Sequence, residues 1–195
     1  MPHLLLKDLP RYECLLEAAK EFPELDPSAA EAFLHLLRTA DDAFSVTERN
    51  LTGHSISQGR FCVLMLLWRS IQPRVAKLLG ASCECAGPRT PAELADAAGV
   101  TRATMTGLVD TLERDGYVKR EPDTHDRRMM SVLLTPKGEQ FLREFLPGHF
   151  KVTGTIMSTL SETERRTLVR LLTKVQQQAA VLNLAHNGTP AASVG

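Results

Sequence analysis

Two helix start signals follow one another closely in the middle of the chain, and they constrain the fold more than any other feature. The first is the capping box Thr90-Pro-Ala-Glu93, with proline at the first helical position, which predicts a short helix over 91–98. The second is Thr101, which can cap a helix over 102–114 directly after Gly99. We therefore expect two short helices joined by a three-residue turn.

Beyond Asp115-Gly116 the hydrophobic period changes from that of a helix to that of a strand. Residues 117–121 are predicted to form a strand, and 122–128 form a polar turn that contains basic side chains. On the return strand the apolar residues alternate and are expected to point inward; they are Met130, Val132 and Leu134. Two short helices followed by a basic hairpin are typical of a winged helix-turn-helix, a plan whose chemistry is the reading of DNA.

Apolar residues recur at helical spacing in the flanking regions, so helices are predicted on both sides of the hairpin. The expected helices cover 12–22, 28–52 with Gly53 after its end, a core helix after Ser57 through 61–68, a helix from Thr135-Pro136 that breaks at Pro147-Gly148, and a long helix after the capping box Ser161–Glu164. The last helix carries an apolar stripe close to a heptad pattern, formed by Leu168, Leu171, Leu172, Val175, Ala179 and Leu182. Because little core is left to cover, this stripe predicts a homodimer interface.

The predicted fold is mainly α-helical, with a winged helix-turn-helix lobe, a two-stranded β-hairpin wing and a helical dimerisation lobe. The expected segments are an N-terminal extension with a short helix (1–27), the first scaffold helix and the core helix (28–70), a connecting segment (71–89) with a loop at 80–89, the DNA-binding lobe (90–138), the C-terminal dimerisation helices (139–186) and a disordered tail (187–195).

The candidate DNA-binding residues lie in the first turn of the second short helix and in the hairpin. The helix offers hydroxyl and methyl groups that can approach base edges, with one guanidinium, and the hairpin offers basic groups for phosphates. The predicted set is Thr101, Arg102, Thr104, Met105, Thr106, Lys119, Arg120, Asp126, Arg127 and Arg128.

At this point the sequence resembles a known family. The stretch Thr90–Gly138, and above all its hairpin sequence Asp-Thr-His-Asp-Arg-Arg over 123–128, resembles the DNA-binding lobe of the MarR family of transcriptional regulators. The resemblance implies a homodimer whose second short helix enters the major groove of double-stranded DNA at an inverted repeat, while a wing arginine reaches the minor groove. It also implies that Asp126 orients a wing arginine through a salt bridge. The acidic N-terminal extension is similar to that of the urate-responsive branch, whose ligand residues this chain does not retain.

Family members respond to small molecules where the two lobes meet, so the resemblance also implies an effector site. The expected ligand is a small, largely apolar or aromatic acid, and the residues expected there offer the mixture of polar and apolar side chains that a small-molecule site needs. The candidate residues are Phe33, His35, Arg38, Arg60, Phe61 and Met65.

The cysteines and histidines favour no metal site and no cofactor. Cys83 and Cys85 are too close together for the usual Cys-x-x-Cys metal motif, and the six His residues form no cluster that would complete a site. The two thiols remain candidates for a redox response.

The charge distribution and the remaining motifs limit the classes of protein to which this chain can be expected to belong. The 23 basic and 23 acidic residues balance, but residues 1–50 carry a net −5 and the rest carry +5. No apolar run is long enough to span a membrane, so a cytoplasmic protein is expected. No nucleophile elbow or phosphate loop is present, and an enzyme is not expected. The alternative to a ligand-responsive repressor is a winged-helix module that binds another protein, which the zero net charge favours.

Overall fold

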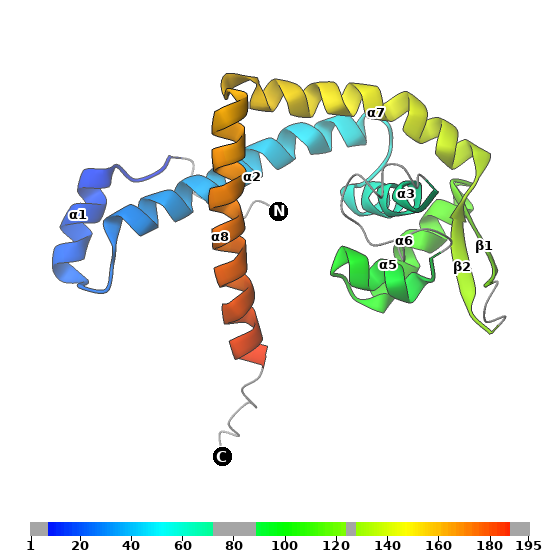
Figure 1. Cartoon of the computed structure of the whole chain (residues 1–195), viewed down its shortest axis with the longest axis horizontal. Coiled ribbons are helices and arrows are strands. Elements are labelled where there is room, and N and C mark those ends of the chain that lie inside the picture. The colour runs from blue at the N-terminus through cyan, green and yellow to red at the C-terminus, as the bar shows by residue number, and fades with distance from the viewer. Residues whose placement is uncertain (1–7, 72–88, 124–127, 188–195) are drawn as a thin grey trace, which may run out of the picture. The chain divides into compact units, whose positions relative to one another are not determined.

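Helices make up most of the protein, and a single β-hairpin supplies the named strands among the described residues (Figure 1). The computed structural model describes residues 8–71, 89–123 and 128–187. Its contacts divide the chain into two units, Met1–Phe150 and Lys151–Gly195. The elements are α1 (Tyr12–Glu21), α2 (Pro27–Thr52), α3 (Gln58–Ile71), α5 (Pro91–Ala98), α6 (Arg102–Arg114), β1 (Val118–Pro122), β2 (Met130–Leu134), α7 (Pro136–Ile156), the 3-10 turn η2 (Met157–Thr159) and α8 (Glu162–Asn187).

The first unit opens with α1 and α2, which contact each other and lie close to the predicted ranges. Asp26 caps α2, because its Oδ1 accepts hydrogen bonds from the amides of Ser28 (2.9 Å) and Ala29 (3.2 Å). Hydrogen bonds from Ser28 and Ala29 lower the pKa of the Asp26 carboxyl group. The local sequence thus fixes where the long helix begins.

The central element of the first unit is α3, which contacts α2, α5, α6 and β2. Ser57 precedes it, and its Oγ accepts a hydrogen bond from the Arg60 amide (3.4 Å). Phe61, Val63 and Leu64 are buried in the hydrophobic core of this unit, as the prediction of a core helix requires. The winged helix-turn-helix elements therefore rest on α3.

The two short helices begin and end at the predicted residues. Thr90 Oγ1 accepts a hydrogen bond from the Glu93 amide (3.3 Å), and Glu93 Oε2 accepts one from the Thr90 amide (2.7 Å), which completes the capping box. Gly99 ends α5 with φ of 64°, a left-handed conformation that favours glycine. Thr101 Oγ1 caps α6 by accepting from the Thr104 amide (3.1 Å).

The wing is an antiparallel hairpin in which Val118 pairs with Leu134 and Pro122 pairs with Met130. The prediction that Met130 points inward is wrong, since this side chain is 41% exposed. The Pro122–Met130 pair closes the ladder next to the turn, where both residues are exposed. Ser131 is buried instead, and its Oγ donates a hydrogen bond to Asp123 Oδ2 (2.5 Å).

A single backbone bridge extends this hairpin on its β2 side. The Val132 amide donates a hydrogen bond to the Arg89 carbonyl (2.8 Å), and the two residues pair in antiparallel fashion. The residue that precedes the first short helix is thereby tied to the wing. Of the loop predicted over 80–89, residues 80–88 lie outside the described residues.

Helix α7 continues through Pro147-Gly148, so the predicted break at these residues is wrong. Pro147 has no amide hydrogen and removes one hydrogen bond from the helix. Residues on both sides of it pack against the same core ring, because Phe145 and His149 lie 5.3 Å and 5.0 Å from Phe61 between ring centroids. These contacts keep α7 continuous where the local sequence alone favours a break.

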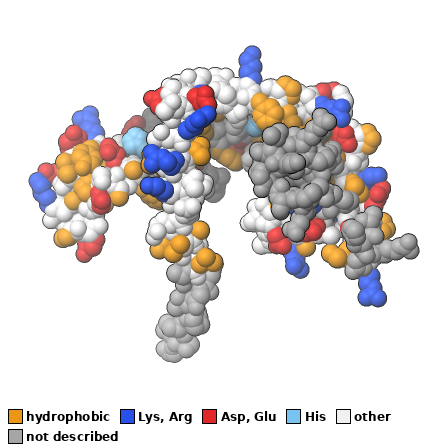
Figure 2. All heavy atoms as spheres, viewed as in Figure 1, with side chains coloured by type: hydrophobic (Ala, Val, Ile, Leu, Met, Phe, Trp, Pro, Cys, Tyr) orange, Lys and Arg blue, Asp and Glu red, His pale blue; other side chains and the backbone are white. Residues whose placement is uncertain are grey.

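The second unit contains the end of α7 and the long helix α8. The predicted capping box is present: Ser161 Oγ accepts from the Glu164 amide (3.3 Å), and Glu164 Oε2 accepts from the Ser161 amide (2.7 Å). Large apolar side chains are exposed along α8 (Figure 2); they are Val169, Leu171, Val175, Val181, Leu182 and Leu184. Among the described residues no helix is both long enough and apolar enough to cross a membrane.

Candidate nucleic-acid interface

The first turn of α6 presents exposed side chains of the kind that can approach base edges. Thr101, Arg102, Thr104 and Thr106 are all exposed, as predicted. The hydroxyl oxygens of Thr101 and Thr104 lie 2.9 Å apart, and Thr106 Oγ1 donates to the Arg102 carbonyl (2.9 Å). Because these hydroxyl groups bond within the helix, Arg102 is the long polar side chain that this turn offers to a partner.

Met105 does not belong to this exposed set, which corrects the prediction that it contacts DNA. Its side chain is 0% exposed, like those of Val109 and Leu112. The spacing explains the placement, because residues four and seven positions apart lie on the same helix face. Met105 therefore anchors α6 to the core.

Arg120 of β1 joins the wing to α6. Its guanidinium is 22% exposed and forms ion pairs of 2.5 Å with Asp110 and with Glu113, while its amide donates to Glu113 Oε1 (2.9 Å). Burial alone would lower the pKa of the Arg120 guanidinium, but the hydrogen bonds to Asp110 and Glu113 outweigh burial and raise it. Arg120 was predicted to lie near phosphates; in the structure it neutralises two carboxylates of α6 and couples helix to wing.

The other described hairpin residues lie on either side of Arg120, with Lys119 next to it toward the base of the wing and Arg128 at the turn. Lys119 is exposed and pairs with Glu121 (2.6 Å), a surface pair that competes weakly with an outside partner. Arg128 is exposed as well. Asp126 and Arg127 lie outside the described residues, so their predicted roles in DNA binding remain predictions.

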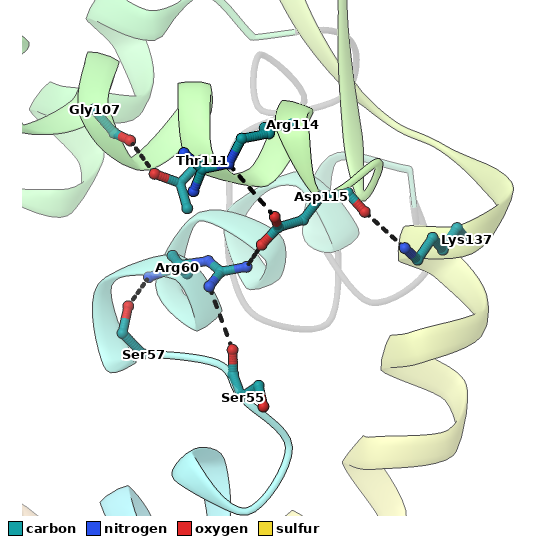
Figure 3. Close-up of polar contacts among 8 residues, drawn as sticks. All are labelled: Ser55, Ser57, Arg60, Gly107, Thr111, Arg114, Asp115 and Lys137. Carbon is teal, nitrogen blue, oxygen red and sulfur yellow. Dashed lines mark hydrogen bonds and ion pairs between the residues drawn. The ribbon is translucent and has the colours of Figure 1, made fainter.

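The C-terminal end of α6 is held by two neighbouring helices (Figure 3). Arg60, in the first turn of α3, pairs with the Asp115 carboxylate and also donates to the Ser55 carbonyl (3.3 Å). Lys137, in the first turn of α7, donates to the Asp115 carbonyl (2.7 Å). Ser55 has φ of 58°, which is uncommon for a residue with a side chain. We call Ser55, Arg60, Asp115 and Lys137 the α6 junction.

Sequence analysis did not predict this junction, because Arg60 and Asp115 are 55 residues apart and no local motif connects them.

Replacing Arg60 by glutamine should lower the free energy of unfolding by about 1–2 kcal/mol, since it removes a charged hydrogen bond made by an arginine side chain that is only 15% exposed. The matched control is Arg166→Gln, because the Arg166–Glu162 pair is 80% and 71% exposed and should contribute about 0.5 kcal/mol or less. Equal shifts of the two variants in urea denaturation would contradict the prediction.

The six residues predicted for an effector site are not gathered at one place. Arg60 is committed to Asp115, and Phe61 packs in the core against Phe145. Phe33 is 58% exposed on α2 and lies 18 residues before the buried Leu51, about 27 Å away along the helix axis. His35 is exposed, whereas Arg38 and Met65 are half-buried. The arrangement supports no single pocket built from all six side chains.

The described thiols and carboxylates form no metal site. No group of three metal-ligating side chains comes together within residues 8–71, 89–123 and 128–187. Burial raises the pKa of the half-buried Cys62 thiol, which makes it less reactive at neutral pH. Cys83 and Cys85, the predicted redox candidates, lie outside the described residues.

Two short helices with an exposed, arginine-bearing first turn, followed at once by a hairpin that is ion-paired to the second helix, define a winged helix-turn-helix protein. The predicted fold class is therefore confirmed.

Comparison with known proteins narrows this class. The model of the MarR family matches residues 56–130. The HTH-type transcriptional repressor YetL of Bacillus subtilis is 35% identical over 176 residues, which cover 90% of this chain and 97% of YetL. The chain belongs to the MarR family, as the resemblance of Thr90–Gly138 implied.

Solved structures agree on the fold. The MarR family regulator Sco3205 of Streptomyces coelicolor, solved in complex with DNA, superposes with a TM-score of 0.63 at 21% identity, over 80% of this chain and 93% of that one. BpsR of Bordetella bronchiseptica gives a TM-score of 0.58 at 23% identity, over 73% and 91% of the two chains.

Proposed function

We propose that this protein is a sequence-specific transcriptional repressor that binds an inverted repeat of double-stranded DNA as a homodimer. The observation that carries the proposal is the exposed first turn of α6, where Arg102 projects beside Thr104 and Thr106 while the same helix is anchored from behind by Met105. A guanidinium can read a guanine through two hydrogen bonds, and threonine methyl groups can contact thymine. YetL, which shares 35% identity with almost the whole chain, is a repressor.

In this proposal the helix and the wing of one protomer bind one half of the operator. Helix α6 lies in the major groove, and the exposed wing residues Lys119 and Arg128 contact phosphates or the minor groove. A two-fold dimer presents two copies of α6, so the half-sites should lie about one helical turn apart. The wing should move together with α6, because Arg120 of the wing is ion-paired to Asp110 and Glu113 of α6.

We further propose that a small molecule, such as an aromatic acid, releases the repressor from its operator. BpsR, a structural neighbour, is regulated in its DNA binding by 6-hydroxynicotinic acid. An effector can act only if it binds more tightly to a dimer whose two α6 helices are wrongly spaced. The α6 junction is the place where such a change would pass from α3 and α7 to α6, because Arg60 and Lys137 both hold Asp115.

The test is a gel shift with DNA from upstream of the protein's own coding sequence, titrated with salt against random DNA. We expect a preference for the upstream DNA and an affinity that falls steeply with salt, because phosphate contacts release counterions. Arg102→Ala should weaken operator binding about tenfold or more while changing random binding less, because base contacts carry the sequence preference.

Lys20→Ala is the control, since it removes one positive charge from an exposed pair on α1. Wild-type protein that shows no preference over random DNA would instead favour the module that binds another protein. A complex as stable with Arg102→Ala as with wild type would remove Arg102 from the proposed interface.

A further inference from the structure

Gly107 lies in the middle of α6, where glycine serves no purpose within the chain. A Cβ atom built at this position meets no atom within 4 Å, and the backbone is not left-handed. Glycine is the least favourable residue in a helix interior apart from proline, because it loses the most backbone freedom. Alanine would fit and would stabilise the helix, so the chain itself gives no reason for the glycine.

Gly148 and Gly154 have equally open surroundings, so what distinguishes Gly107 is its position on α6. It follows Met105, the buried anchor of the helix, by two residues and therefore projects about 200° away from it. It lies one turn beyond Ala103 and Thr104, on the same exposed face of the helix as these two residues. The backbone at this point is thus bare on the side of α6 that the proposed function turns toward DNA.

The charges on the next turn of α6 also allow DNA to approach Gly107 closely. Asp110, three residues beyond Gly107, would repel a phosphate, but its carboxylate is paired with Arg120 (2.5 Å). Glu113 is paired with the same guanidinium. A polyanion can therefore come close to Gly107 without facing an uncompensated carboxylate on α6 at these two positions.

The pairing also predicts how far a disturbance at Gly107 would spread. The wing is tied to α6 through Arg120, so a group that holds α6 away from the groove also lifts the wing. A single methyl group would then weaken contacts on both elements.

We propose that Gly107 is a specificity-determining residue that sets how closely α6 approaches the DNA: its bare Cα lies against the floor or wall of the major groove, and any side chain there holds the helix off. The proposal rests on the proposed function. Glycine is kept at the expense of helix stability because it permits close contact between a backbone and a ligand.

The experiment compares Gly107→Ala with Gly148→Ala in the full-length protein. Gly148 is also an exposed helical glycine with nothing within 4 Å of its Cβ position, but it lies in α7, away from the helix-turn-helix and the wing. Both variants should melt about 2–4 °C higher than wild type, because both gain helix propensity. Only Gly107→Ala should lose operator affinity, by about tenfold or more, and Gly107→Val should lose more still.

Each outcome separates this proposal from the proposed function. If wild-type protein prefers its upstream DNA and Gly107→Ala binds that DNA equally well, the inference about Gly107 is overturned and the repressor function stands. If wild-type protein has no such preference, both are overturned. A loss of affinity that also occurs in Gly148→Ala would show a general effect of added helix stability and would likewise overturn the inference.

Discussion

Replacing Gly138 by alanine is expected to lower the free energy of unfolding by about 2–4 kcal/mol, although alanine favours helices. Gly138 lies in the first turn of α7, and a Cβ atom built there would stand 2.2 Å from the Tyr117 carbonyl oxygen and 3.1 Å from Leu134 Cδ2. The carbonyl cannot move freely, because it accepts hydrogen bonds from the Thr135 amide (3.0 Å) and from Thr135 Oγ1 (3.2 Å). Either α7 or the base of the wing must shift.

Urea denaturation measures this effect, with Gly148→Ala as the matched control in the same helix. Both glycines lie in α7 but their surroundings differ, since nothing lies within 4 Å of a Cβ at Gly148. Gly148→Ala should therefore raise the denaturation midpoint and Gly138→Ala should lower it. A midpoint for Gly138→Ala at or above that of wild type would show that the wing base yields without loss.

The parts of the fold that the sequence alone predicts are those whose contacts are local. Helix ends marked by caps are readable because all their partners lie within a few residues, as at Thr90 with Glu93 and at Thr101 with Thr104. The local pattern is wrong at Pro147, because the rings of Phe145 and His149 contact Phe61 from a distant part of the chain. Contacts between residues so far apart in the sequence do not affect the local hydrophobic pattern.

The residues of the candidate site also differ in how well the sequence predicts them. The exposed first turn of α6 follows from the helix start at Thr101, and the helical period identifies Met105 as a core residue once the face of Val109 and Leu112 is known. Arg120 was predicted from its charge alone, and charge does not reveal that Asp110 and Glu113 already pair with it. The ion pair of Arg60 with Asp115 forms where α3 contacts α6, and only the folded chain shows this contact.

Placing two glutamates in the apolar stripe of α8, as Leu171→Glu with Val175→Glu, is expected to convert the proposed dimer into monomers. Leu171 is 48% exposed and Val175 is 49% exposed in the single chain, and the two lie one turn apart on the same face. A second copy that covers this face would have to bury both carboxylates without a partner, which is strongly unfavourable. Cutting the chain after Arg165 removes the same stripe and should act in the same direction.

The expected readouts are a halved mass by light scattering and an operator affinity lower by about 100-fold or more, because a monomer binds a single half-site and loses the gain of simultaneous binding. The control is the pair Thr173→Glu and Gln177→Glu, which adds the same charge to the face of α8 away from the stripe. Control protein should stay dimeric and bind normally. Leu171→Glu/Val175→Glu protein that remains a dimer would place the interface elsewhere. A monomer with full operator affinity would contradict the claim that two copies of α6 bind together, because the spacing of the half-sites would then have no energetic role.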